Sequence, residues 1–371
     1  MMLAGEASGD AHAAEVVHEL KKLQADIYVS GMGSNEMKKA GVDVFFDSAS
    51  IAVVGIVEVV KHWGEIKQAM ERVKQKLETT HPDLLVLIDY PEFNLKMARH
   101  AKSLGIKVLF YISPQVWAWR PKRIHKIGRS IDHMAVLFKF ETGYYEKANI
   151  PVTFVGHPLV DKVRTTELVG QERERLNIPN DHRVVGLFPG SRNSEISRLL
   201  PVMLETAGLM HRQDNRLSFV LPVAATLDCE SIKQQCKDSG IDVHLTTDNL
   251  YDVIRYCDAI VSCSGTVTLE IALRGVPFCT IYKMSWLSYQ IMSRLITIEH
   301  IGLANIVANQ PVIKELLQDQ ASAETISREM FRLLDDQGYR EQVTDNLKKV
   351  RQNLGKGEGS KHMAELIQTF V

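Results

Sequence analysis

Residues 189–195 read Pro-Gly-Ser-Arg-Asn-Ser-Glu, a turn whose residue types suit the binding of an anionic group. They follow the apolar run 184–188 and precede apolar residues at helical spacing. A strand ending in such a turn leaves the first backbone N–H groups of the next helix unpaired and points them, with the positive end of the helix dipole, at one place. Gly190, Ser191 and Arg192 are therefore candidates for binding a diphosphate. An ordinary strand-to-helix turn is the alternative.

A second turn, rich in small hydroxyl residues, spans 262–270. Its amides suit another part of a phosphate, with Ser264, Gly265 and Thr266 around the ligand. Glu270 lies one turn inside the following helix, where its carboxylate can reach a pair of ribose hydroxyls. A capped helix with an incidental glutamate would explain this segment alone. Two such turns in one half of the chain favour a nucleotide diphosphate site.

A carboxylate suited to general base catalysis follows the apolar run 84–88. Asp89 is expected to emerge at the end of a central strand, where partial burial would raise its pKa. Glu92 and Asn94 lie close enough in sequence to share that site, although Asn94 could equally cap a helix. A turn residue ahead of Pro91 is the alternative for Asp89 itself.

The loop 5–10 joins the first strand to the first helix and lacks the G-x-G-x-x-G spacing of a dinucleotide site. Hydride transfer is therefore disfavoured. Ser8 and Asp10 could cap the helix that follows. Glu6 has no packing purpose at a strand end, so it is kept as a candidate for the chemistry.

Two segments combine features of a lipid-binding surface. Residues 116–123 hold two tryptophans beside three cations, and residues 51–63 are richer in apolar side chains than one buried helix face requires. Rings with cations suit lipid headgroups, and an apolar helix too short to span a bilayer can dock an acyl chain. The alternatives are stacking on nucleic-acid bases or a partly buried helix for the first segment, and a core helix for the second.

Composition limits the classes of protein to which the chain can belong. It has 371 residues, 45% hydrophobic and 24% charged, with a formal net charge of −1, which argues for two domains and against a nucleic-acid partner. No apolar stretch is long enough to span a membrane, and no basic leader precedes an apolar core, so a cytoplasmic protein is expected. Five cysteines without a C-x-x-C pair favour buried reduced thiols, and no metal-binding or cofactor motif is present.

The elements that must position these residues alternate between short apolar runs and helical patterns. Strands are expected at 1–4, 27–30, 84–88, 108–112, 134–137, 152–155, 184–188, 217–221, 243–245, 259–262 and 278–281. The pattern predicts an α/β protein with two doubly wound Rossmann-like domains facing a cleft. We place the first domain at 1–160, the second at 161–355 and a C-terminal helix, able to pack back on the first domain, at 356–371.

Taken together, these segments resemble the lipid-A-disaccharide synthase family, glycosyltransferases of the two-domain GT-B class. The matching motifs, in order, are residues 5–10, 54–59, 88–94, 111–120, 155–158, 189–192 and 264–266. The resemblance implies inverting transfer from UDP-2,3-diacylglucosamine to 2,3-diacylglucosamine 1-phosphate, which yields the β-1,6-linked disaccharide 1-phosphate and UDP. It also implies a cytoplasmic enzyme, peripheral on the inner face of the bacterial inner membrane; a homo-oligomer stays open.

The resemblance implies three groups of site residues. Asp89 would be the general base for the acceptor 6-hydroxyl, with Glu6 and Ser8 facing the reacting sugars. The nucleotide would be bound by Gly190, Ser191, Arg192, Ser264, Gly265, Thr266, Glu270 and Asn305. Acyl chains and the membrane would meet Val53, Val54, Ile56, Val57, Val60, Trp117, Trp119, Arg120, Lys122 and Arg123.

The sequence departs from the family pattern at two places, and two alternative functions stay open. The family usually has Asp where Glu92 stands, and a Gly-Arg pair where Asn309 and Gln310 stand. The first change keeps the charge, whereas the second removes a cation from a loop near the predicted nucleotide site. A UDP-sugar 2-epimerase of the same fold and a non-catalytic membrane-surface protein are the alternatives.

Overall fold

The computed structural model describes residues 1–50, 63–119, 123–163, 173–284 and 300–371. The chain divides into two compact units, Met1–Pro158 with Leu354–Val371, and Leu159–Asn353. We call them unit 1 and unit 2. The division into domains predicted at 1–160, 161–355 and 356–371 stays a prediction.

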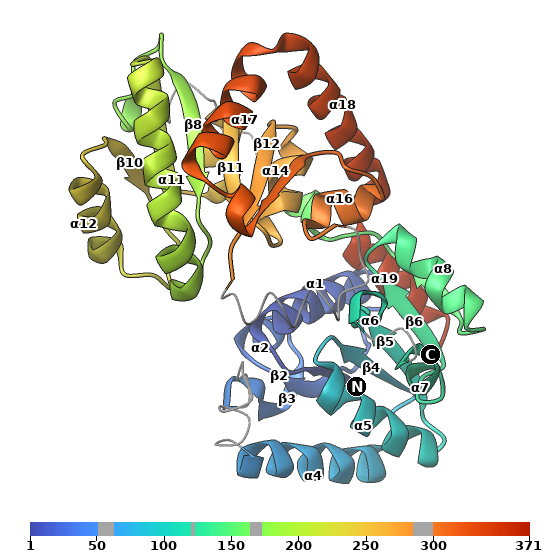
Figure 1. Ribbon diagram of the computed structural model, residues 1–371. Helices are drawn as coiled ribbons and strands as arrows, with labels where there is room; N and C mark the ends of the chain where they lie inside the picture. The colour runs from blue at the N-terminus through green and yellow to red at the C-terminus, as the bar shows by residue number, and fades with distance from the viewer. Residues whose placement is uncertain (51–62, 120–122, 164–172, 285–299) are drawn as a thin grey trace. The chain divides into compact units, whose positions relative to one another are not determined.

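Unit 1 is built on seven parallel strands in the order β3-β2-β1-β4-β5-β6-β7 (Figure 1). The chain begins at a central strand, winds out to one edge and returns past its start, as doubly wound sheets do. The carboxyl ends of β1, β4 and β5 therefore lie side by side. The strands are β1 (Met2–Ala4), β2 (Ser30–Gly33), β3 (Asp43–Asp47), β4 (Leu84–Ile88), β5 (Lys107–Tyr111), β6 (His133–Val136) and β7 (Val152–Phe154).

Helices cover both faces of this sheet because successive strand side chains point to opposite sides. On β4, Leu85 and Leu87 join one buried cluster with α4 and α5, while Val86 and Ile88 join another with α1 and α19. The helices of unit 1 are α1 (Ala7–Leu23), α2 (Asn35–Lys39), α4 (Trp63–Thr80), α5 (Pro91–Ser103), α6 (Val116–Trp119), α7 (Ile124–Gly128), α8 (Lys139–Lys147) and α19 (Gly359–Gln368).

The C-terminal helix α19 belongs to unit 1 although it follows unit 2 in sequence. Its buried residues Met363, Ala364 and Ile367 share a core with α1. The Ser360 hydroxyl donates to Glu15 of α1 at 3.2 Å, and the His362 ring is 3.0 Å from the Val155 carbonyl oxygen. The end of the chain therefore contributes to the core of the unit in which the chain begins.

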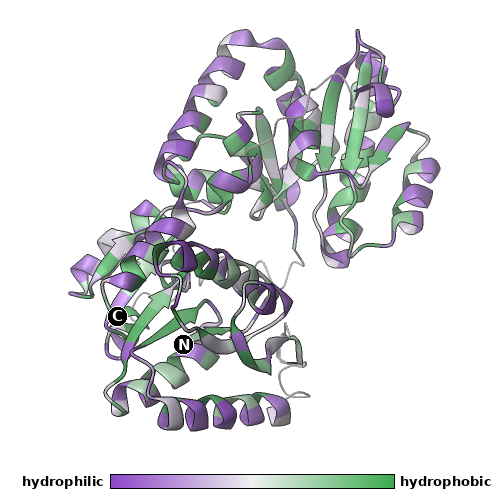
Figure 2. Cartoon of the chain, turned by 180° about the vertical axis from the view of Figure 1, so that it is seen from behind, coloured by the Kyte–Doolittle hydropathy of each residue, from purple (hydrophilic) through white to green (hydrophobic). Residues whose placement is uncertain are grey.

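Unit 2 repeats the plan with six parallel strands in the order β10-β9-β8-β11-β12-β13. Its strands are β8 (Arg183–Phe188), β9 (Leu217–Pro222), β10 (Val243–Thr246), β11 (Ala259–Cys263), β12 (Phe278–Tyr282) and β13 (Lys314–Leu317). Its helices are α9 (Leu159–Lys162), α11 (Asn193–Gln213), α12 (Cys229–Ser239), α13 (Leu250–Tyr256), α14 (Val267–Arg274), α16 (Leu303–Ala308), α17 (Ala323–Asp335) and α18 (Gln337–Asn353). Hydrophobic colour is concentrated in the strands, and hydrophilic residues lie along the helices (Figure 2). The fold class is α/β with two doubly wound parallel sheets, as predicted.

Three features near the sheet edges differ from the expected elements. Strands β3 and β13 were not predicted, because each is a short edge strand with charged residues and only partly buried side chains. Strand β2 lies at Ser30–Gly33 and not at 27–30; its sequence, Ser-Gly-Met-Gly, carries none of the residues that favour strands. Central strand β4 matches the predicted range 84–88.

Two further expectations concern membranes and thiols. Among the helices described, none combines the length and apolar character needed to cross a bilayer. All five cysteines fall in the described part of unit 2 and are free thiols, four of them buried and Cys229 partly exposed. Burial raises the pKa of the Cys263 thiol, at the end of β11, to about 12, so this thiol stays protonated at neutral pH and is a poor nucleophile.

Candidate active site

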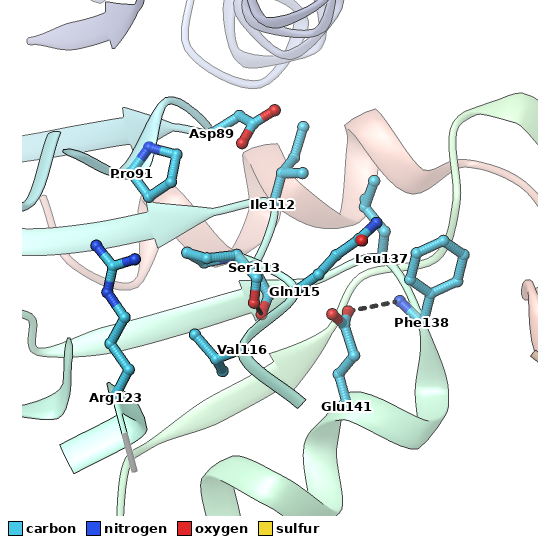
Figure 3. Close-up of a pocket in the computed structure, with 11 residues that line it drawn as sticks. Asp89, Pro91, Ile112, Ser113, Gln115, Val116, Arg123, Leu137, Phe138 and Glu141 are labelled. Carbon is cyan, nitrogen blue, oxygen red and sulfur yellow. Dashed lines mark hydrogen bonds between the residues drawn. The ribbon is translucent and has the colours of Figure 1, made fainter. Parts of the chain in front are cut away.

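A pocket of about 450 Å³ opens beside Asp89 in unit 1 (Figure 3). This volume falls within the range of about 300–1,000 Å³ that is typical of small-molecule sites. Asp89, Ile112 and Leu137 each follow the end of a strand, β4, β5 and β6, so the pocket lies at the carboxyl edge of the sheet. The lining residues are Asp89, Pro91, Ile112, Ser113, Pro114, Gln115, Val116, Arg123, Leu137, Phe138 and Glu141.

The backbone around Asp89 has positive φ angles, a conformation that residues other than glycine rarely adopt. Asp89 and Tyr90 have φ of 48° and 47°, and Ile112, across the pocket, has φ of 69°. A β-branched residue at such an angle is strained, and strain of this kind concentrates at functional sites. The Asn94 side-chain amide donates to the carbonyl oxygens of Ile88 and Asp89 at 3.2 and 2.7 Å. Asn94 thus fixes the turn that carries Asp89, and it lies inside α5 instead of capping it.

The electrostatics of this turn couple Asp89 to Glu6. Burial raises the pKa of the Asp89 carboxyl, and a hydrogen bond from the Tyr90 backbone opposes part of that rise. Burial also raises the pKa of Glu6, and the charge of Asp89 adds to it. The Tyr90 ring lies so close to Gly5 that a Cβ there would be 2.2 Å from Cδ1 of the ring. Two carboxylates from neighbouring strand ends are therefore brought within electrostatic reach.

The loop after β1 differs in detail from what its sequence suggested. Helix α1 begins at Ala7, so Ser8 and Asp10 lie within its first turn, and Ser8 is exposed. The Asp10 carboxylate accepts hydrogen bonds from the backbone N–H groups of Ser34, Glu36 and Met37 at 2.6, 2.9 and 3.3 Å. The idea that Asp10 caps its own helix is wrong, because its carboxylate caps α2.

A buried carboxyl, Glu141, forms the floor of the pocket and was missed in the sequence. The residue is 2% exposed and accepts a hydrogen bond from the Trp117 indole at 3.2 Å. It accepts a second from the Phe138 backbone N–H at 3.3 Å, the dashed line in Figure 3. Burial raises the pKa of Glu141 to about 7, against the effect of those donors. Glu141 is the third residue of α8, but Phe138 stands at the N-cap in place of the Ser or Thr of a capping box, so no sequence signal pointed to it.

The Trp117 side chain, after β5, is more buried than a residue of a lipid-binding surface would be. Trp117 is 6% exposed, and its ring packs edge-on against Phe140 at 5.1 Å. The prediction that this ring faces a membrane is therefore wrong, because the ring belongs to the core of unit 1. Arg123 lines the pocket and forms an ion pair with Glu92 of α5. Trp119 ends α6.

Several predicted lipid-contact residues lie outside the described part of the chain. They are Val53, Val54, Ile56, Val57, Val60, Arg120 and Lys122. Their lipid-binding role stays a prediction.

Unit 2 holds a second pocket, of about 550 Å³, at the carboxyl ends of β8 and β11. Seven of the eight residues predicted to bind a nucleotide line it: Gly190, Ser191, Arg192, Ser264, Gly265, Thr266 and Glu270. Burial raises the pKa of Glu270, while a hydrogen bond with Tyr251 and the charge of Lys162 act in the opposite direction. The two turns singled out in the sequence thus form one pocket.

Glu195 occupies part of the anion-binding turn in this structure. Its carboxylate accepts from the backbone N–H groups of Ser191 and Arg192 at 2.9 and 3.2 Å and pairs with the Arg192 guanidinium at 3.0 Å. The expectation that these amides are unpaired is therefore wrong. Gly190, with φ of 117°, allows this approach, because a Cβ there would lie 2.2 Å from the carboxylate. Arg192 itself is 77% exposed.

Asn305, the eighth predicted residue, is buried away from the pocket lining. Its amide group donates to the Ile313 carbonyl oxygen and to Glu315, and its oxygen accepts from the N–H groups of Val312 and Ile313. With both ends of the amide engaged, its role is to hold the 310–315 loop. Asn309 ends α16 with φ of 51°, a left-handed position that suits Asn as well as the usual Gly.

Comparison with solved structures identifies the fold. The UDP-GlcNAc 2-epimerase of Neisseria meningitidis superimposes with a TM-score of 0.60 at 12% identity, over 99% of this chain and 98% of its own. The glycotransferase of kitacinnamycin superimposes with a TM-score of 0.66 at 13% identity, over 100% of this chain and 98% of its own. At such identities the likeness concerns the fold alone.

Sequence relatives are much closer. A lipid-A-disaccharide synthase of Geobacter sulfurreducens is 48% identical over 99% of this chain and 96% of its own length, and one of Coxiella burnetii is 40% identical over 100% and 98%. The family model for lipid-A-disaccharide synthetase matches residues 1–370. The chain therefore belongs to the lipid-A-disaccharide synthetase family.

Proposed function

We propose that this chain is an inverting glycosyltransferase that joins UDP-2,3-diacylglucosamine to 2,3-diacylglucosamine 1-phosphate. The products are the β-1,6-linked lipid A disaccharide 1-phosphate and UDP. The observation that carries most weight is the whole-chain family match, with residues 1–370 covered by one model. The gathering of seven predicted nucleotide contacts around one pocket supports the donor assignment.

In the proposed reaction Asp89 removes the proton from the acceptor 6-hydroxyl as that oxygen attacks the anomeric carbon of the donor. The bond from that carbon to the UDP oxygen breaks, and configuration is inverted. A carboxylate with a raised pKa on a rigid turn suits this role, because a general base works best when its pKa is close to the pH of the reaction. Glu6 is coupled to it electrostatically and would face the reacting sugars with Ser8.

Leaving-group stabilisation is assigned to unit 2. The diphosphate would bind at the start of α11 between Ser191 and Arg192, where backbone N–H groups and the helix dipole favour negative charge. Arg192 would exchange its pairing with Glu195 for the diphosphate. Ser264, Gly265 and Thr266 would contact the rest of the nucleotide, and Glu270 its ribose.

The two alternatives are not favoured. Epimerases are similar in fold but only 12% identical in the case of the Neisseria enzyme, whereas the disaccharide synthases reach 48%. A non-catalytic membrane-surface protein would not need a strained, partly buried carboxylate in a pocket.

A direct assay separates these functions. The purified chain is incubated with UDP-2,3-diacylglucosamine and 2,3-diacylglucosamine 1-phosphate, with a chelator present, and the products are identified by mass spectrometry. Formation of disaccharide and UDP is expected. A parallel incubation with UDP-GlcNAc alone tests for 2-epimerisation, and an epimer there without disaccharide in the first reaction would overturn the proposal.

We propose that the chain acts at a membrane surface, on the inner face of the inner membrane, because its proposed substrates are acylated. Flotation with vesicles that contain anionic lipid should recover the chain with the vesicles, and recovery should fall with added salt if cations contribute. Light scattering of the purified chain would decide whether identical chains associate.

A further inference from the structure

We propose that Arg123 binds the phosphate of the acceptor, so that the acceptor lies in the unit 1 pocket with its phosphate at Arg123 and its 6-hydroxyl at Asp89. This inference rests on the proposed function, since it takes the acceptor to be a sugar phosphate. It gives Arg123 a role as a specificity-determining residue and not as part of a membrane surface.

The position of Arg123 supports this role. It lies immediately before α7, lines the same pocket as Asp89, and has a side chain only 24% exposed. Its guanidinium contacts Glu92, which is three residues beyond Asp89 on the turn and start of α5. Three residues span at most about 11 Å between Cα atoms, so Glu92 and Asp89 lie on the same short stretch of backbone, and Arg123 and Asp89 line the same pocket. Figure 3 shows the two side chains entering from different sides.

The charges in the pocket determine which end of the acceptor goes where. Arg123 is the only cationic side chain among the described residues that line it, and the lining also includes the carboxyl groups of Asp89 and Glu141. A phosphate would be repelled by an ionised carboxylate and attracted by the guanidinium, which offers a planar set of donors. The phosphate therefore belongs at Arg123, and the uncharged hydroxyl at Asp89.

The ion pair with Glu92 does not block this binding. The Glu92 side chain is 77% exposed, and exposed pairs of this kind contribute little stability. A phosphate dianion carries one more negative charge than the Glu92 carboxylate and can contact the guanidinium through two oxygens. We expect Glu92 to move into solvent when the acceptor binds.

The test compares two acceptors, 2,3-diacylglucosamine 1-phosphate and the same sugar without phosphate. The wild-type chain should prefer the phosphorylated acceptor. Arg123→Ala should lose about 10- to 100-fold in kcat/KM with the phosphorylated acceptor, mainly through KM, which is the size of one charge-assisted contact. The kcat/KM of Arg123→Ala with the unphosphorylated acceptor should differ little from that of the wild type. Arg123→Lys should restore part of the preference, and the KM for the donor should stay constant in every variant.

Two controls make the result specific. Arg129→Ala removes an exposed arginine at the end of the same short helix and should leave the preference for phosphate unchanged. Glu92→Gln frees Arg123 and should leave the acceptor KM unchanged or lower it a few-fold. If Arg123→Ala keeps the wild-type preference for the phosphorylated acceptor, the inference is wrong. If the wild-type chain converts neither acceptor, the proposed function itself has failed.

Discussion

Burial of the Glu141 carboxyl should make the free energy of unfolding depend on pH by a predictable amount. Burial raises its pKa from an ordinary 4.5 to about 7 in the folded chain. At pH values between these two pKa values, Glu141 is protonated in the folded state and ionised in the unfolded state. The free energy of unfolding therefore falls as pH rises. The penalty is complete above about pH 7 and absent below about pH 4.5. At about 1.4 kcal/mol for each pH unit, it reaches roughly 3 kcal/mol.

Glu141→Gln should remove this penalty because the amide does not ionise. The variant loses part of the hydrogen bonding to Trp117 and Phe138, worth about 1 kcal/mol each, at every pH. The difference in unfolding free energy between variant and wild type should therefore shift by about 2.5 kcal/mol in the variant's favour from pH 5 to pH 8.

Urea unfolding monitored by tryptophan fluorescence at several pH values provides the assay, since the Trp117 ring contacts Glu141. Glu146→Gln, an exposed change on the same helix, is the matched control and should show no such shift. Parallel pH dependences for the wild type and Glu141→Gln would refute the reasoning.

Two other variants test the turns that carry the proposed chemistry. Glu195→Gln should tighten UDP binding by up to about 5-fold in calorimetry, because the competing charge at Ser191 and Arg192 is gone; weaker binding would mean that Glu195 contacts the nucleotide. Asn94→Ala should lower kcat through the loss of its support of the Asp89 turn and cost about 1–3 kcal/mol of stability, with the donor KM unchanged; an unchanged kcat would argue against a positioning role.

Local sequence patterns predicted the elements whose own residues are uniformly apolar or repeat at a regular spacing. Strand β4 is five consecutive apolar residues buried on both faces, and its range matched. Edge strands β3 and β13 are mixed and partly exposed, so they give no clear pattern. The two turns that line the unit 2 pocket were recognisable because strand, turn and helix follow one another directly.

Contacts made across long stretches of sequence could not be predicted in the same way. Asp10 caps a helix that begins at Asn35, and Glu141 meets Trp117 from a different element. The position of Arg123 beside Glu92 depends on how α5 and α7 pack. Burial of each group follows from the assembled sheet, which local spacing does not encode.

The most direct test of the central claim is disaccharide formation by Asp89→Asn, with UDP binding measured on the same preparation. Asparagine preserves the size of the side chain but cannot accept the proton, so turnover should fall by about 10²- to 10⁴-fold. UDP should bind as it does to the wild type, since its proposed contacts all lie in unit 2. Turnover near the wild-type rate in a folded, UDP-binding variant would contradict the assignment of Asp89 as the base.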